Sequence, residues 1–98
     1  MNLIAVIMPK RFWNNYGYAF ASKYRRNIVI ALHNNPKTPS QLSKELKFNI
    51  SHISRALKEL EVKEIVICLN PNIKKGRVYS LTDKGTEIAK ILSRARDL

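Results

Sequence analysis

The segment between Asn49 and Leu60 carries side chains that can bond to nucleic-acid bases, spaced so that they share one side of a helix. Each helical residue turns the chain by about 100°, which collects apolar residues on one side and polar residues on the other. Arg55 can bond guanine through two N–H groups, and short hydroxyl side chains can meet base edges or phosphates. The candidate contact residues are Ile50, Ser51, His52, Ser54, Arg55 and Lys58. The alternative is an ordinary amphipathic helix with a solvated polar face.

A second group of candidates consists of three cations that are close together in the chain. Lys74, Lys75 and Arg77 surround Gly76 at the expected tip of a hairpin, where they can contact phosphates or a minor groove. Lysines also serve to protect the edge of a sheet from pairing with another chain, which is the alternative here. A polar helix followed directly by a basic hairpin is a more specific signal than either feature alone.

The charge of the chain points to the same kind of partner. Lys and Arg number 18 against 7 Asp and Glu, which gives the 98 residues a net charge of +11. So large an excess on so small a body indicates an anionic partner, with double-stranded DNA ahead of an anionic membrane surface. The apolar run Leu3–Met8 is far shorter than the roughly 20 residues of a spanning helix, and no targeting signal is evident. We therefore expect no membrane partner and a cytoplasmic protein.

Two helices are needed to position the contact segment. The sequence Thr38-Pro39-Ser40-Gln41 combines a capping box with proline at the first helical position, so it predicts the start of a helix that ends near Lys47. Asn49 then begins the contact helix, and the short turn between the two is that of a helix-turn-helix. The N-terminus of the first helix is a further candidate DNA contact, through Thr38, Ser40 and Gln41.

The flanking sequence predicts the rest of a small, mainly α-helical domain. Ser22 begins an earlier helix that Pro36 stops. The β-branched runs Ile65–Leu69 and Arg77–Leu81, with a glycine between them, predict an antiparallel hairpin, and Thr82 begins a last helix. The expected fold is a winged helix-turn-helix, with a three-helix core, a two-stranded wing and a C-terminal helix.

Residues 1–20 differ from the remainder of the chain. An apolar run is followed by five aromatic residues between Phe12 and Phe20. We expect a hydrophobic and aromatic arm that lies on the domain or on a second copy, with residues 21–98 forming the winged domain. A base-stacking platform is the alternative, because aromatic faces bind unstacked bases.

Residues 22 to about 92 resemble the small winged helix-turn-helix transcriptional regulators of the ArsR/MarR-like type common in archaea. The resemblance lies in the segments Ser22–Arg26, Thr38–Leu42, Ser51–Leu60 and Lys75–Gly85. It implies that Arg55 and its polar neighbours lie on a recognition helix and that the three cations lie on a wing. Lys47 stands where such proteins often have glycine, so it must adopt a left-handed conformation or end the helix differently.

The resemblance also implies a homodimer, often built through the terminal helices. The apolar residues of the last helix can face either a second chain or the chain's own core: Ile88, Ile91, Leu92 and Ala95. Cys68, His33 and His52 lie in three different elements, so a cluster of thiolate and imidazole ligands is not expected. We expect neither a metal site nor another cofactor, and no effector is identified.

The sequence shows no catalytic pattern. Gly17, Gly76 and Gly85 are too far apart for a phosphate-binding loop, and no serine or cysteine stands in a nucleophile motif. The expected function is that of a non-enzymatic, sequence-specific regulator of transcription that binds double-stranded DNA. The alternatives are an architectural protein that binds DNA regardless of sequence and a winged-helix module that binds proteins in a larger complex.

Overall fold

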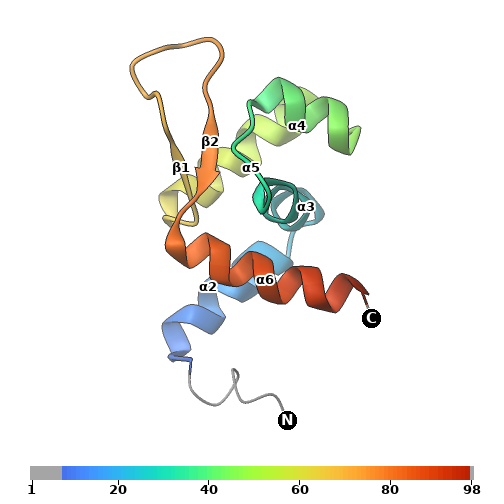
Figure 1. The fold of residues 1–98 in the computed structure, drawn as a ribbon, viewed down its shortest axis with the longest axis vertical. Coiled ribbons are helices and arrows are strands. Elements are labelled where there is room, and N and C mark those ends of the chain that lie inside the picture. The colour runs from blue at the N-terminus through green and yellow to red at the C-terminus, as the bar shows by residue number, and fades with distance from the viewer. Residues whose placement is uncertain (1–7, 98) are drawn as a thin grey trace.

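The computed structural model describes residues 8–97, with side chains as far as Arg94. It confirms the winged-helix fold and contains one helix more than the sequence predicts (Figure 1). Helices α3, α4 and α5 form the three-helix core, strands β1 and β2 form the wing, and α2 and α6 pack below them. The elements are α2 (Lys10–Phe20), α3 (Lys23–Leu32), α4 (Pro39–Leu46), α5 (Ile50–Val62), β1 (Val66–Cys68), β2 (Tyr79–Leu81) and α6 (Asp83–Asp97).

Side-chain caps begin three helices at the predicted residues. The Ser22 hydroxyl accepts a hydrogen bond from a backbone N–H in the first turn of α3, at 3.3 Å. The capping box of α4 is complete, since the Gln41 N–H donates to Thr38 Oγ1 (3.1 Å) and the Thr38 N–H donates to Gln41 Oε1 (2.8 Å). Asn49 Oδ1 accepts from the Ser51 N–H at 3.0 Å and so begins α5. Each cap satisfies N–H groups that the helix itself leaves unpaired.

The turn between α4 and α5 uses a lysine where glycine is the easier residue. Lys47 has φ 59° and ψ 35°, so of the two possibilities that the sequence left open it adopts the left-handed conformation. The Ser43 hydroxyl donates to the carbonyl of Phe48 at 2.6 Å, and the half-buried Phe48 ring packs against the core. These contacts hold α5 at a fixed position after α4.

The wing has shorter strands than the sequence predicts. Val66–Cys68 pairs antiparallel with Tyr79–Leu81, and beyond this pairing the Asn70 side chain takes part in the hairpin. Asn70 Oδ1 accepts from the Val78 N–H at 2.8 Å, and its Nδ2 donates to the Gly76 carbonyl at 3.2 Å. The side chain replaces part of the backbone ladder, so a long basic loop extends from a short sheet.

A residue from the loop before α4 also joins the wing. Lys37 and Tyr79 exchange two backbone hydrogen bonds, of 3.0 and 2.9 Å. This single pair ties the loop before α4 to strand β2. A one-residue bridge produces no periodic pattern, and for this reason the sequence did not indicate it.

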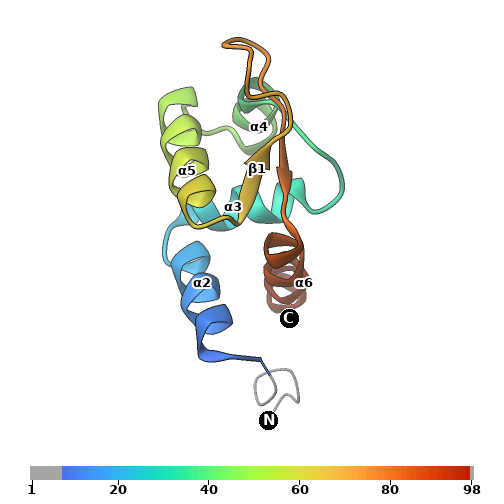
Figure 2. The same cartoon turned by 90° about the vertical axis from the view of Figure 1, so that its left-hand side faces the viewer.

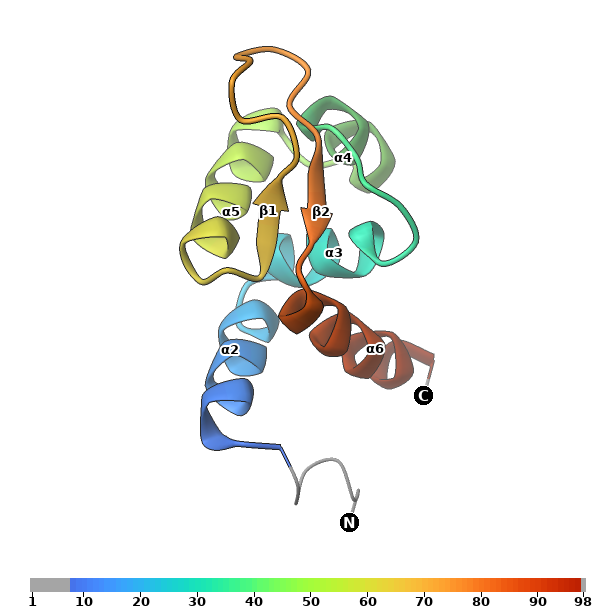
Figure 3. The same cartoon turned by 60° about the vertical axis from the view of Figure 1, so that its left-hand side comes forward.

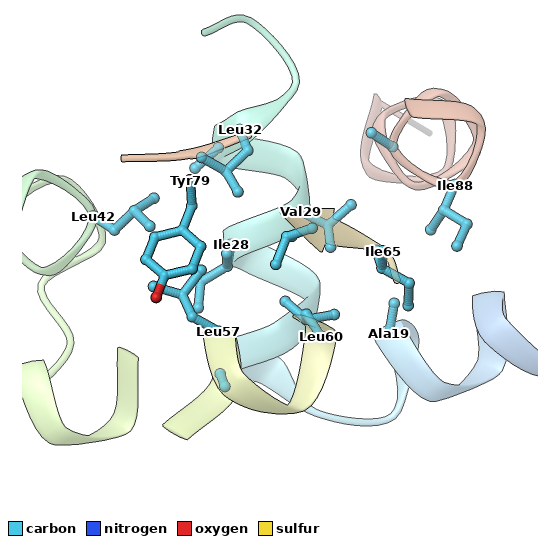
Figure 4. Close-up of a cluster of buried hydrophobic side chains, with 14 of the residues drawn as sticks. Ala19, Ile28, Val29, Leu32, Leu42, Leu57, Leu60, Ile65, Tyr79 and Ile88 are labelled. Atoms are coloured by element: carbon cyan, nitrogen blue, oxygen red, sulfur yellow. The ribbon is translucent and has the colours of Figure 1, made fainter. Parts of the chain in front are cut away.

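The core forms around α3, and every other element contributes buried side chains to it, α5 as many as four. Figure 4 shows side chains of α3, α5, β1 and α6 converging, with Ala19 of α2 at one edge. Ile28 and Val29 of α3 are completely buried, as are Leu60 and Ile65. The apolar side of α5 therefore faces inward, and its polar side is left for solvent or a partner.

Residues 10–20 form helix α2, which packs on α3 and α6 and places Phe12 and Ala19 in the core. The described part of the expected arm is thus a helix of the domain, while residues 1–7 lie outside the described range. The sequence did not reveal this helix for two reasons. Pro9, which stands immediately before the helix, makes no side-chain cap, and Gly17 stands in its interior, where glycine is a poor helix former.

Candidate nucleic-acid interface

The polar side of α5 is exposed as the helical periodicity predicts. Ile53, Leu57 and Leu60 are buried, whereas Arg55 and Lys58 are exposed on the opposite side. Ser51, His52 and Ser54 are exposed too. The first-turn residue Ile50 follows the apolar pattern and yet is 46% exposed, because it lies beyond the end of the core.

A hollow of about 460 Å³ separates the start of α5 from the wing. Figure 3 shows the wing rising beside α4 and α5 at the end of the molecule away from α2. The hollow brings together predicted residues from three elements: Thr38, Ser40, Ile50, Ser54, Lys74, Lys75 and Arg77. Pro39, Leu57, Gly76 and Tyr79 also line it and were not predicted. Tyr79 is next to α4 through its bridge to Lys37, which the sequence did not indicate.

The other predicted residues of α4 and α5 lie outside this hollow. Gln41 is engaged in the capping box, and the Ser51 hydroxyl donates to Asn49 Oδ1 at 3.0 Å. Arg55 and Lys58 project from the exposed side of α5, and within residues 8–97 neither forms an ion pair. They are available to an anionic partner that lies along the helix.

His52 is held by a neighbour in a way that the sequence did not indicate. Its ring stacks on Tyr24 of α3, with 4.5 Å between the centroids and 6° between the planes. Tyr24 in turn packs edge-on against Phe48 at 4.9 Å. Stacking covers one face of the imidazole ring and fixes its plane, while the residue as a whole stays exposed.

The three cations of the wing divide into two kinds. Lys74 and Lys75 are fully on the surface, and no ion pair within the described chain involves them. Arg77 instead donates from Nε to the Ile73 carbonyl (2.9 Å) and from a terminal nitrogen to the Pro71 carbonyl (3.0 Å). A hydrogen bond to the Tyr79 side chain raises the pKa of Arg77 above its ordinary value, and the guanidinium is charged in any case.

The candidate dimer residues of α6 differ in how deeply they are buried. Ile88 and Leu92 are 0% and 2% exposed, so they belong to the chain's own core, which was one of the two possibilities. Ile91 is half-buried, and the side chain of Ala95 is outside the described part. A more exposed apolar feature is on α2, where the rings of Trp13, Tyr16 and Phe20 follow one another at 5.5 and 6.0 Å; Phe20 is 47% exposed.

Within residues 8–97 there is no group of three or more His, Cys, Asp or Glu side chains placed to hold a metal ion. Over the same range no helix has the length and apolar character needed to cross a membrane.

Comparison with known proteins agrees with this architecture. Residues 22–67, just under half of the chain, match the family model described as bacterial regulatory protein, arsR family. No curated protein matches the sequence significantly.

Solved structures of similar fold include three bacterial proteins. A mutant of ZitR from Lactococcus lactis is 22% identical, with a TM-score of 0.68 over 78% of this chain and 53% of its own. HlyU from Vibrio cholerae is 22% identical, with a TM-score of 0.73 over 93% and 100%. The adhesin competence repressor AdcR from Streptococcus pyogenes is 19% identical, with a TM-score of 0.69 over 78% and 57%. The chain spans little more than half the length of ZitR and AdcR in these matches, and the likeness establishes the winged-helix fold.

Proposed function

We propose that this chain is a transcriptional regulator of the arsR type that binds double-stranded DNA and reads its sequence. The observation that carries the proposal is the exposed polar side of α5 next to a basic wing, with an open hollow between them. A major groove admits an α-helix, and a neighbouring wing then reaches the backbone or the next minor groove.

The comparisons with known proteins support this proposal independently of the geometry of the site. The matched family consists of regulatory proteins, and the match includes α3, α4, α5 and most of β1. ZitR has also been solved in complex with DNA; that structure is 20% identical and has a TM-score of 0.68 over 99% of this chain and 77% of its own. The net charge of +11 fits the same kind of partner.

Each element has a separate role in the proposed complex. Arg55, exposed in the middle of α5, bonds a guanine edge, and the hydroxyl groups at the start of α5 bond base edges or phosphates. At the N-terminus of α4, the Ser40 N–H and the Ser40 hydroxyl bond a phosphate. Lys74 and Lys75 neutralise phosphates on the wing side, which gives affinity without information about sequence.

We further propose that two copies form a symmetric dimer through α2 and α6. The aromatic ladder of α2 leaves Phe20 about half exposed at its end, and Ile91 of α6 is only half-buried. Such a dimer carries two copies of α5 and reads two half-sites about one turn of DNA apart, roughly 34 Å.

Selection of bound duplexes from a random pool tests the proposal, followed by competition between a selected duplex and random DNA at moderate salt. A reader of sequence enriches a two-fold symmetric motif and prefers it by about 10³-fold or more. Binding without enrichment instead identifies an architectural protein, which the high charge favours. If the chain binds no duplex, both DNA-binding functions are contradicted, and a protein-binding module is the remaining alternative.

A further inference from the structure

One side of α5 away from the hollow rests on a group that we call the corner: Tyr18, Tyr24 and Arg25, where α2 meets α3. Figure 2 shows α5 above α2 on the same side of the molecule, with the beginning of α3 between them. Besides the stacking of Tyr24 on His52, the corner makes one more contact with α5 and one with Lys63, the residue that follows α5. Arg25 donates to Glu59 Oε1 at 3.2 Å, and the ammonium group of Lys63 lies 5.3 Å from the Tyr18 ring.

The three residues in these contacts, two of α5 and one immediately after it, form a continuous stripe. His52, Glu59 and Lys63 are seven and four residues apart, which places them above one another on a helix. The stripe therefore runs along most of α5. The corner is placed to set the orientation of the whole helix rather than that of one side chain.

Arg25 is at the centre of the corner. Its Nε donates to the Tyr18 carbonyl at 2.8 Å, and its guanidinium carbon lies 3.9 Å from the centre of the Tyr18 ring. Its side chain is only 14% exposed, whereas that of Glu59 is 38% exposed. The one guanidinium thus bonds the last turns of α2, an aromatic face and the carboxylate of α5. A planar guanidinium can make these contacts together, and an ammonium group cannot.

We propose that Arg25 is a positioning residue for DNA recognition: through Tyr18 and Glu59 it fixes the orientation of α5 relative to α2. The inference rests on the proposed function. Arg25 itself does not contact DNA. Its effect is on how well the exposed side chains of α5 meet the base edges, and therefore on the preference for one sequence over another.

The test uses three variants and a control in the full chain. Arg25→Met keeps much of the side-chain length and removes the guanidinium, Glu59→Gln keeps the shape and removes the charge, and the third variant combines both. Lys90→Met is the matched control, because it removes the same positive charge from an ion pair with Glu87 whose side chains are 52% and 53% exposed. Binding to a selected duplex and to random DNA is measured for each variant over a range of salt concentrations.

We expect Arg25→Met to reduce the preference for the selected duplex about tenfold relative to Lys90→Met. The salt dependence of the two variants should be the same, because neither residue contacts a phosphate. Glu59→Gln should reduce the preference as well, and the double variant should be no worse than Arg25→Met alone. If Glu59 is merely a negative charge near DNA, Glu59→Gln instead strengthens binding to all duplexes alike, which overturns the proposal.

A measurement without DNA separates this inference from the proposed function. In NMR spectra of the folded, free proteins, Arg25→Met and Glu59→Gln should shift the same amide resonances along α5 and at the end of α2, and Lys90→Met should leave them in place. Unchanged α5 resonances in Arg25→Met refute the positioning role even if DNA is bound. If the α5 resonances shift but the original chain prefers no duplex, the contact between Arg25 and α5 is supported and the proposed function is refuted.

Discussion

The cations on the proposed DNA side are not equivalent at the scale of single residues. Arg55, Lys74 and Lys75 are exposed and form no ion pair within residues 8–97, whereas Arg77 is bonded to two carbonyls of its own loop. A cation without a partner in the protein can use all of its N–H donors to bind a phosphate or a base. The difference separates residues that contact DNA from one that shapes the loop presenting them.

Replacing Arg55 with alanine should cost about 1–3 kcal/mol of binding to the selected duplex and relax the preference at one base position. The reason is that a bidentate contact to guanine is lost while most phosphate contacts remain. Binding of Arg55→Ala to duplexes varied at each position measures this effect. An equal loss of affinity for selected and random DNA excludes a base-reading role for Arg55.

Lys74→Ala and Lys75→Ala should weaken binding to every duplex by the same factor. Each lysine that neutralises a phosphate releases counterions, so each variant should reduce the slope of log K against log salt by about 1. Titrations of selected and random DNA at several salt concentrations measure both quantities. A change of sequence preference in either variant contradicts a purely electrostatic role for the wing.

At the scale of elements, the placement of the wing depends on a close approach between α6 and the start of β1. The Thr82 hydroxyl donates to the Glu64 carbonyl at 2.7 Å and accepts from the Gly85 N–H at 3.1 Å. A side chain on Gly85 meets the backbone carbonyl of Ile65, which has no freedom to move away. Gly85 is required because there is no room for a Cβ atom at this position. Its backbone conformation is that of an ordinary helical residue.

Gly85→Ala should therefore destabilise the protein by about 1–3 kcal/mol, the usual range for an overpacked site. The control is Gly17→Ala in α2, where the added methyl group meets open space. There alanine should stabilise the protein by up to about 1 kcal/mol, because it is the better helix former. Urea unfolding of both variants measures the two changes. A Gly85→Ala variant as stable as the original chain contradicts the close packing of α6 on β1.

At the scale of the whole molecule, apolar side chains remain exposed at several places after the core has formed. Phe20, at the end of the aromatic ladder, is 47% exposed, and Ile67 on the outer side of β1 is 49% exposed. The two positions have similar exposure and lie on different parts of the surface, so one can serve as the control for the other.

If the dimer forms through α2 and α6, sedimentation should give twice the 11.3 kDa mass of one chain. Phe20→Ser should shift the protein toward the monomer, because the variant removes apolar area from the interface. Ile67→Ser should leave the mass unchanged. A monomeric original chain contradicts the proposed dimer, and dissociation by Ile67→Ser alone places the interface on the wing instead.

Local chemistry determined much of this protein from its sequence. The caps at Ser22, Thr38 and Asn49 predicted where three helices begin, because each cap acts between residues two or three positions apart. The helical period separated the buried and exposed sides of α5, and two β-branched runs predicted the hairpin. The exposed candidates of α5 and the wing follow from these short-range patterns.

Only the tertiary structure decided the features that join distant parts of the chain. Packing on α3 and α6 makes a helix of residues 10–20 without a side-chain cap, and the bridge from Lys37 to Tyr79 ties the wing to α4. The hollow beside the wing and the stacking of His52 on Tyr24 also depend on the tertiary structure. Some of these contacts join residues far apart in the chain, 28 positions for Tyr24 and His52 and more than 60 for α2 and α6. Their strength depends on mutual burial, which no local pattern of residue types encodes.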